Sequence, residues 1–171
     1  MNVVFLDYDG VINTPCWKHD SSGWHTFLCY PGDGYVNNTQ AIQWVSEFCQ
    51  KHNYGIVVSS TWKRFSNWQE CLQTSGLRPG IEIVGRTKNL SNEYNTFVTR
   101  GRSEEIATYL FSHPEVERYL IFDDEDIHSV TIESYTFNLK EHLVHCNYFN
   151  GFLGTEYFRA QYLHEHYDTI G

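Results

Sequence analysis

The chain has 171 residues, a length that suits one domain with a single hydrophobic core. Five Trp, twelve Tyr and eleven Phe indicate a folded protein rather than a disordered segment. The formal charge of −9 argues against non-specific binding to nucleic acids or membrane surfaces, because both need broad basic surfaces, but it leaves room for a local basic site.

The cysteines and the apolar runs bear on the compartment. Five cysteines are scattered along the chain and form no Cys-x-x-Cys pair, which favours reduced thiols and a cytoplasmic location. No apolar run approaches the length of a membrane span, and the N-terminus lacks the pattern of a secretion signal. We therefore expect no association with a membrane.

The first predicted strand leads directly into two carboxylates. Residues 3–6, Val-Val-Phe-Leu, are typical of a short strand that is buried on both faces of a parallel sheet. Asp7 and Asp9 follow, and Gly10 marks a turn. Open α/β sheets bind ligands at the carboxyl ends of their strands, so both side chains are expected to reach one pocket. Since two nearby carboxylates repel each other, this pocket needs a cation, a proton or a polar partner.

A long segment rich in turn-forming residues, 13–36, comes next. Residues 24–30 could form one arm of a hairpin. A loop of this length is uncommon in a compact domain and is usually functional, so we expect residues 13–36 to form a small flap over the active site. Trp24, in this flap, could stack on a substrate base or exclude water, or it could simply anchor the loop.

Helices and strands alternate along the rest of the chain. Helices are expected from residue 38 or 39 to residue 52 or 53, and over 67–74, 103–111 and about 155–166. Strands are expected over 54–60, 81–85, 119–122 and 142–146. This order predicts an α/β fold: a three-layer, Rossmann-like parallel sheet with helices on both faces, forming one domain over residues 1–171.

Three of the predicted strands end in polar side chains that could form one site. These side chains belong to Asp7, Asp9, Ser59, Ser60, Asp123, Asp124 and Asp126. They can converge because the carboxyl ends of parallel strands lie at one edge of the sheet. Several carboxylates in one crevice are costly unless a divalent cation compensates their charge. With oxygen ligands only, the expected ion is Mg²⁺.

Cationic side chains lie near the same predicted edge. Lys63 follows the serine pair, and Arg100 and Arg102 lie just before the helix predicted over 103–111. Arg102 could simply be a solvated residue at the start of a helix. Asp126 could bind a metal through water or could simply begin a helix.

These motifs resemble those of the haloacid dehalogenase (HAD) superfamily of phosphohydrolases. Asp7-Tyr8-Asp9-Gly10-Val11 matches the first motif, DxDG[TV], and the pair Asp123-Asp124 matches the acidic fourth motif. Ser59 or Ser60 stands at the second motif. The third motif is a phosphate-binding cation, most often lysine, and the resemblance favours Arg102 for it, with Arg100 as the next candidate and Lys63 as a further possibility. An arginine can bind phosphate through two hydrogen bonds, whereas a lysine acts as a point charge.

More narrowly, the chain resembles a small capless branch of the family, whose related domains are associated with RNA-repair proteins. This resemblance is carried by residues 59–63, residues 102–106 and the closing segment with His-Leu-Val at 142–144 and Gly-Phe-Leu at 151–153.

The resemblance implies a Mg²⁺-dependent phosphatase that forms an aspartyl-phosphate on Asp7. Asp9 would be the general acid and then the general base. The metal ligands would be Asp7, the backbone carbonyl of Tyr8 or Asp9, Asp123 and Asp124. The substrate phosphate would contact Gly10, Ser59, Ser60, Thr61 and Arg102.

Larger HAD enzymes carry a cap domain, but here residues 13–36 hold only a flap and residues 86–101 hold no domain. Such a capless site would be open, which suits a macromolecular or nucleotide-end phosphate. The phosphorylated partner could be a nucleic-acid end, a nucleotide or a phosphoprotein. Basic residues in the loops near the predicted site would suit a nucleic acid despite the acidic total charge. Two alternatives remain: a catalytically silent HAD fold that serves as a binding module, and a small-molecule or nucleotide phosphatase or phosphotransferase.

Overall fold

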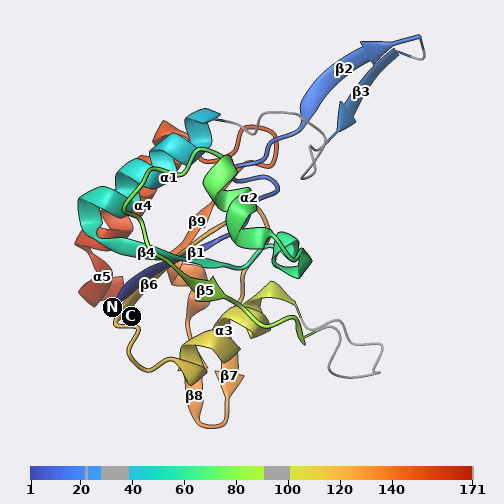
Figure 1. Ribbon diagram of the computed structural model, residues 1–171. Coiled ribbons are helices and arrows are strands. Elements are labelled where there is room, and N and C mark those ends of the chain that lie inside the picture. Colours follow the sequence, from blue (N-terminus) through green and yellow to red (C-terminus); the bar gives the residue numbers. More distant parts are fainter. Residues whose placement is uncertain (22, 28–38, 91–100, 171) are drawn as a thin grey trace.

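The computed structural model contains a five-stranded sheet at its centre (Figure 1). In spatial order the strands are β5 (Ile83–Arg86), β4 (Tyr54–Val58), β1 (Asn2–Leu6), β6 (Arg118–Asp123) and β9 (Leu143–His145). All neighbouring strands are parallel, so their carboxyl ends share one edge. The structure describes residues 1–21, 23–27, 39–90 and 101–170, and for residues 16–20 and 23–27 it describes only the backbone.

Helices cover both faces of this sheet, which confirms the predicted three-layer α/β fold (Figure 1). One face packs against α1 (Thr39–His52), α2 (Trp68–Thr74) and α4 (Gly154–Glu165), and the other against α3 (Arg102–Ser112). The side chains of β1 alternate between the layers: Val4 and Leu6 join the first apolar cluster, and Val3 and Phe5 the second. All four side chains are fully buried, as expected for a strand without a polar face.

Residues 13–36 contain the predicted hairpin. Its strands are β2 (Cys16–Asp20) and β3 (Gly23–Phe27), which pair in an antiparallel manner. In Figure 1 this hairpin extends outward from the rest of the domain. Residues 28–36 lie outside the described part, so the covering of the active site by this segment stays a prediction. The described residues contain no large cap domain.

Several short elements were not predicted. A second hairpin, β7 (Val130–Ile132) and β8 (Tyr135–Phe137), packs against α3. Further short elements of the described part are the 3₁₀ helices η1 (Thr61–Arg64) and η3 (Leu139–His142) and the helix α5 (Tyr167–Ile170). Each of these elements has only three or four residues, which is too short to show a hydrophobic period in the sequence.

Two further observations concern cysteines and membranes. The three cysteines with described side chains, Cys49, Cys71 and Cys146, are buried free thiols. Within the described ranges, every helix is too short or too polar to cross a membrane.

Candidate active site

The register of the central strands places three functional side chains next to one another. Strand β1 continues into Asp7, whose N–H donates to the carbonyl of Phe122 at 3.0 Å. Similarly, the N–H of Ser59 donates to the carbonyl of Leu6 at 3.0 Å. Asp7 therefore lies between Ser59 on one neighbouring strand and Asp123 on the other.

These three side chains point to the α3 face of the sheet. Two residues earlier on the same strands are Phe5, Val57 and Ile121, which lie in the apolar cluster that contains residues of α3. Side chains two residues apart on a strand share a face. The parallel sheet therefore gathers a carboxylate, a hydroxyl and a second carboxylate at one point of its carboxyl edge.

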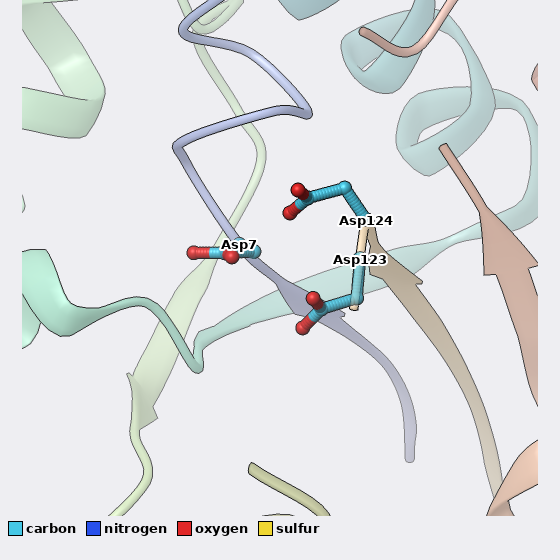
Figure 2. A group of neighbouring side chains, drawn as sticks. All are labelled: Asp7, Asp123 and Asp124. Atoms are coloured by element: carbon cyan, nitrogen blue, oxygen red, sulfur yellow. The ribbon is translucent and has the colours of Figure 1, made fainter. Parts of the chain in front are cut away.

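Asp124 joins this group to give a cluster of three carboxylates (Figure 2). One carboxylate oxygen each of Asp7, Asp123 and Asp124 lies within 4.8 Å of the others. Asp7 is 4% exposed and Asp123 is fully buried. Burial, together with the charge of Asp7, raises the pKa of Asp123 and raises that of Asp124 to about 6. Such a set of closely spaced oxygen ligands could hold a hard divalent cation, which would relieve this repulsion.

Arg102, the first residue of α3, is the cation in contact with the cluster. Its Nη1 atom lies 3.0 Å from Oδ2 of Asp7 and 2.7 Å from Oδ2 of Asp123. Burial opposes the charge of the guanidinium, but Asp7 and Asp123 outweigh this effect and raise the pKa of Arg102. Among the described residues, three carboxylates face one guanidinium, which leaves the cluster short of positive charge.

Asp9 is held apart from the three clustered carboxylates. Its Oδ1 accepts a hydrogen bond from Nδ2 of Asn13 at 2.7 Å, and its Oδ2 accepts one from Nε1 of Trp62 at 3.1 Å. Burial raises the pKa of Asp9, although both hydrogen bonds act in the opposite direction. The structure thus holds a carboxyl group with an increased proton affinity in a fixed orientation beside Asp7, an arrangement that suits a general acid.

The two serines after β4 have different surroundings. Ser60 is the N-cap of η1, and its hydroxyl accepts a hydrogen bond from the N–H of Trp62 at 3.3 Å. The hydroxyl of Ser59 is buried and has no hydrogen-bond partner among the described residues. A buried hydroxyl without a partner is costly. Ser59, which is also the neighbour of Asp7, is therefore better suited than Ser60 to bind a substrate oxygen.

The two backbone carbonyls considered as metal ligands also differ. The carbonyl of Tyr8 already accepts hydrogen bonds from the N–H groups of Val11, Ile12 and Asn13, at 3.2, 2.9 and 2.7 Å. Three donors occupy both of its lone pairs. Of the two, the carbonyl of Asp9 is the better candidate for a metal ligand.

A comparison with protein families identifies the chain. A family model described as the HAD domain in Swiss Army Knife RNA repair proteins matches residues 3–156. The chain belongs to this HAD family. No curated protein and no solved structure matched. The match confirms the resemblance that the sequence motifs suggested, and membership of the HAD superfamily indicates a phosphohydrolase-type activity.

The glycine of the first HAD motif is fitted closely to the acidic cluster. Gly10 has a φ of +77°, and a Cβ at this position would overlap the carboxylate of Asp124, whose Oδ1 and Oδ2 would lie at 2.8 and 2.7 Å. The N–H of Gly10 donates to the carbonyl of Asn13 at 2.9 Å, so it is not free to bind a substrate phosphate. The role of Gly10 in this HAD domain is therefore to make room for Asp124.

Alanine at position 10 should damage the site, because its methyl group would displace Asp124. We expect activity to fall by about 100-fold or more, and the free energy of unfolding to decrease by roughly 1–3 kcal/mol more than in a control with the same backbone strain. Gly80→Ala is that control, since Gly80 has a φ of +88° and its added Cβ would meet no atom within 4 Å. Equal losses of stability and activity in the two variants would contradict the prediction.

The other predicted site residues of this HAD domain lie outside the acidic cluster or outside the described part of the structure. Thr61 is exposed at the start of η1, whereas Lys63 is buried and contacts Glu105. Asp126 is exposed, lies outside the acidic cluster and begins no helix, so its interpretation as a helix start was wrong. Arg100 and the side chain of Trp24 lie outside the described part of the structure.

Sequence reasoning missed the partners of Asp9. The sequence pattern places Asn13 in the long loop 13–36 and gives no reason to select Trp62 as a hydrogen-bond donor to Asp9. The sequence offered only a weak signal for either one: an amide four residues after Asp9, and an indole close to the serine pair. Both contacts depend on the turn at Gly10, whose path cannot be derived from residue spacing.

Proposed function

We propose that this HAD domain is a Mg²⁺-dependent phosphomonoesterase that works through an aspartyl-phosphate on Asp7. The observation that carries the proposal is the arrangement around Asp7. This buried carboxylate touches Arg102, lies beside Asp123 and Asp124, and is accompanied by Asp9, whose pKa is raised. A nucleophile, a cation, a candidate metal site and a separate acid are the components that phosphoryl transfer to a carboxylate requires.

The proposed reaction has two displacements at phosphorus. In the first, a carboxylate oxygen of Asp7 attacks phosphorus and the bond to the ester oxygen breaks, while Asp9 gives its proton to that oxygen. In the second, a water oxygen attacks phosphorus and Asp9 takes a proton from the water. The bond between Asp7 and phosphorus then breaks. Inorganic phosphate leaves, and Asp9 is again protonated.

The other residues of the site bind and orient the phosphate. The hydroxyl of Ser59 and the guanidinium of Arg102 would contact phosphoryl oxygens. Mg²⁺ would be held by Asp7, the carbonyl of Asp9, Asp123 and Asp124, and it would supply positive charge next to these oxygens. Thr61 and Ser60, at the start of η1, would border the phosphate through their backbone.

Mg²⁺ binding should depend on pH because Asp124 has a pKa of about 6 without metal. The ion needs an ionised carboxylate, so a proton on Asp124 competes with it. Below this pKa we expect the affinity for Mg²⁺ to fall by at least about tenfold per pH unit, because a proton on Asp123, whose pKa is also raised, competes in the same direction. Calorimetric titrations test the prediction over a range from pH 5, about one unit below this pKa, to pH 8, about two units above it. A constant affinity over this range would contradict it.

The favoured substrate is the phosphorylated end of a nucleic acid. Arg64, Arg86 and Lys88, a set that we call the basic corner, are exposed where β4 and β5 end, on the side of the site next to Ser59. Phe65, beside them, is 42% exposed. Cations that follow a backbone and aromatic rings that stack on bases are the usual elements of single-strand binding. The matched family, which is described by its RNA repair proteins, agrees with this choice.

A substrate panel tests the proposed function. Hydrolysis of 3′- and 5′-phosphorylated oligonucleotides, nucleotides, sugar phosphates, phosphopeptides and an aryl phosphate is compared in Mg²⁺ and in excess chelator. We expect turnover that requires Mg²⁺ and is fastest with an oligonucleotide. Absence of turnover across the panel would leave the domain as a binding module, and transfer to an added alcohol would identify a phosphotransferase.

The basic corner gives the substrate class its own test. Arg64→Gln combined with Lys88→Gln should raise KM for the oligonucleotide and weaken its dependence on salt, because fewer phosphate contacts release fewer counterions. The aryl phosphate, which has no backbone to contact these residues, should keep its KM. Equal effects on both substrates would argue against a nucleic-acid end.

A further inference from the structure

Lys63 and Glu105 form a buried ion pair directly behind the proposed phosphate site. Their side chains are 4% and 9% exposed, and the ammonium group contacts Oε2 of Glu105. Lys63 lies in η1, four residues after Ser59, and Glu105 lies in the first turn of α3, three residues after Arg102. The pair therefore connects the two elements that carry the proposed phosphate ligands.

The ammonium group of Lys63 has a hydrogen-bond acceptor for each of its three protons. Besides Glu105, it contacts Oγ1 of Thr87 at 2.8 Å and the carbonyl of Ser59 at 3.4 Å. Oε1 of Glu105 in turn accepts a hydrogen bond from the N–H of Leu90 at 3.2 Å. The network thus joins the end of β4, the segment after β5 and the start of α3.

Stability alone is a weak explanation for such a pair. Removing two charges from water costs several kcal/mol, and replacing a buried pair by neutral residues of similar volume is often neutral or stabilising. Burial lowers the pKa of Lys63, and Glu105 opposes this effect. What the pair does provide is directional contacts to the backbone of Ser59 and to the helix turn that begins with Arg102.

We infer that Lys63 and Glu105 are positioning residues for phosphate binding. Lys63 holds the carbonyl of Ser59, which fixes the strand end beside Asp7, where the hydroxyl of Ser59 has no partner among the described residues. Glu105 holds the first turn of α3 against Lys63 and Leu90, which fixes the point from which Arg102 reaches Asp7 and Asp123. This inference rests on the proposed function, since it assigns Ser59 and Arg102 to the phosphate.

The test replaces the pair by neutral residues of similar size. In Lys63→Met/Glu105→Gln the side-chain volume is retained, and the amide oxygen can still accept the hydrogen bond from Leu90. We expect the thermal midpoint to stay close to that of the wild type, while kcat/KM falls by roughly 100-fold, the effect of a displacement of about 1 Å in the site. The affinity for inorganic phosphate in the presence of Mg²⁺, measured by calorimetry, should fall in parallel.

Two controls keep the inference falsifiable. Arg78→Met/Glu47→Gln neutralises a half-exposed pair outside the site, whose Nη1 and Oε2 atoms are 2.5 Å apart, and should leave kcat/KM and phosphate affinity unchanged. If the first double variant does not fold, Thr87→Val removes one acceptor of Lys63 and keeps the ion pair. It should lower kcat/KM by roughly fivefold, the equivalent of one hydrogen bond.

The two readouts separate this inference from the proposed function. A folded Lys63→Met/Glu105→Gln variant with wild-type kcat/KM and wild-type phosphate affinity would overturn the inference, and so would an unaffected Thr87→Val variant. A wild-type domain without turnover would overturn the proposed function. In that case a weaker phosphate affinity in the double variant still supports positioning, and an equal affinity, or no phosphate binding by the wild type, overturns it.

Discussion

Asp7→Asn is expected to abolish turnover while leaving the domain folded. An amide cannot attack phosphorus to form the acyl-phosphate bond, so the rate should fall by at least roughly 10⁴-fold, the scale on which enzymes lose activity without their nucleophile. The substitution keeps the shape of the side chain and removes one of three neighbouring negative charges. Thermal melting should therefore show a domain about as stable as the wild type, and hydrolysis of an aryl phosphate with Mg²⁺ should show the loss.

Two other carboxylates make this result specific. Asp126→Asn changes an exposed side chain outside the acidic cluster and should keep wild-type activity. Asp9→Asn should lower the rate by about 10²–10⁴-fold, because it removes a proton donor and acceptor but not the nucleophile. With a substrate whose leaving group needs no proton, the phosphorylated form of Asp9→Asn should accumulate. Activity that persists in Asp7→Asn would rule out the aspartyl-phosphate.

The gathering of the acidic residues could be predicted from sequence because it depends on topology. Each central strand is an apolar run, and strands that alternate with helices must be parallel, so their ends meet at one edge. The topology alone therefore predicts that Asp7, Asp123 and Asp124 lie together, and in the structure they do. The position of Arg102 at the start of α3 followed from the same topology, since that helix begins at the edge where the strands end.

The features of the site that could not be predicted depend on the backbone paths of individual turns. Spacing suggested that Asp7 and Asp9 reach one pocket, but it could not show that the turn at Gly10 brings Asn13 and Trp62 to the carboxylate of Asp9. The choice between Ser59 and Ser60 needed the strand register and the cap of η1.

Lys63 shows a second limit of sequence reasoning. It was a candidate for the phosphate cation, and only the three-dimensional structure reveals its buried partner Glu105. These two residues lie on different elements, and no local pattern links them.

Arg102→Met should produce the largest change in stability, and that change should depend on Mg²⁺. Arg102 is 8% exposed along its side chain and touches both Asp7 and Asp123. Without it, two buried carboxylates lose their cationic partner, which typically costs about 3–5 kcal/mol. In the presence of a chelator, the free energy of unfolding of Arg102→Met, measured by urea titration, should be lower than that of the wild type by this amount. In Mg²⁺ part of the loss should be recovered, because without the competing charge of Arg102 the cluster should bind the ion more tightly in the variant than in the wild type, and tighter binding stabilises the folded state more.

The matched control is Arg118→Met, at the opposite end of the strand that ends in Asp123. Arg118, at the start of β6, pairs with Asp168 at 2.7 Å, but these side chains are 31% and 79% exposed. Arg118→Met should therefore lose no more than about 1 kcal/mol for the ion pair, with little dependence on Mg²⁺.

Activity separates the two variants further. Arg102→Met loses a phosphate ligand and should turn over at least about 100-fold more slowly even when Mg²⁺ has restored its fold, because a charged group aimed at the transition state contributes on that scale. If Mg²⁺ restored both stability and activity, Arg102 would serve only to neutralise the metal-free cluster, and the binding of the phosphate would be left to Ser59 and the ion.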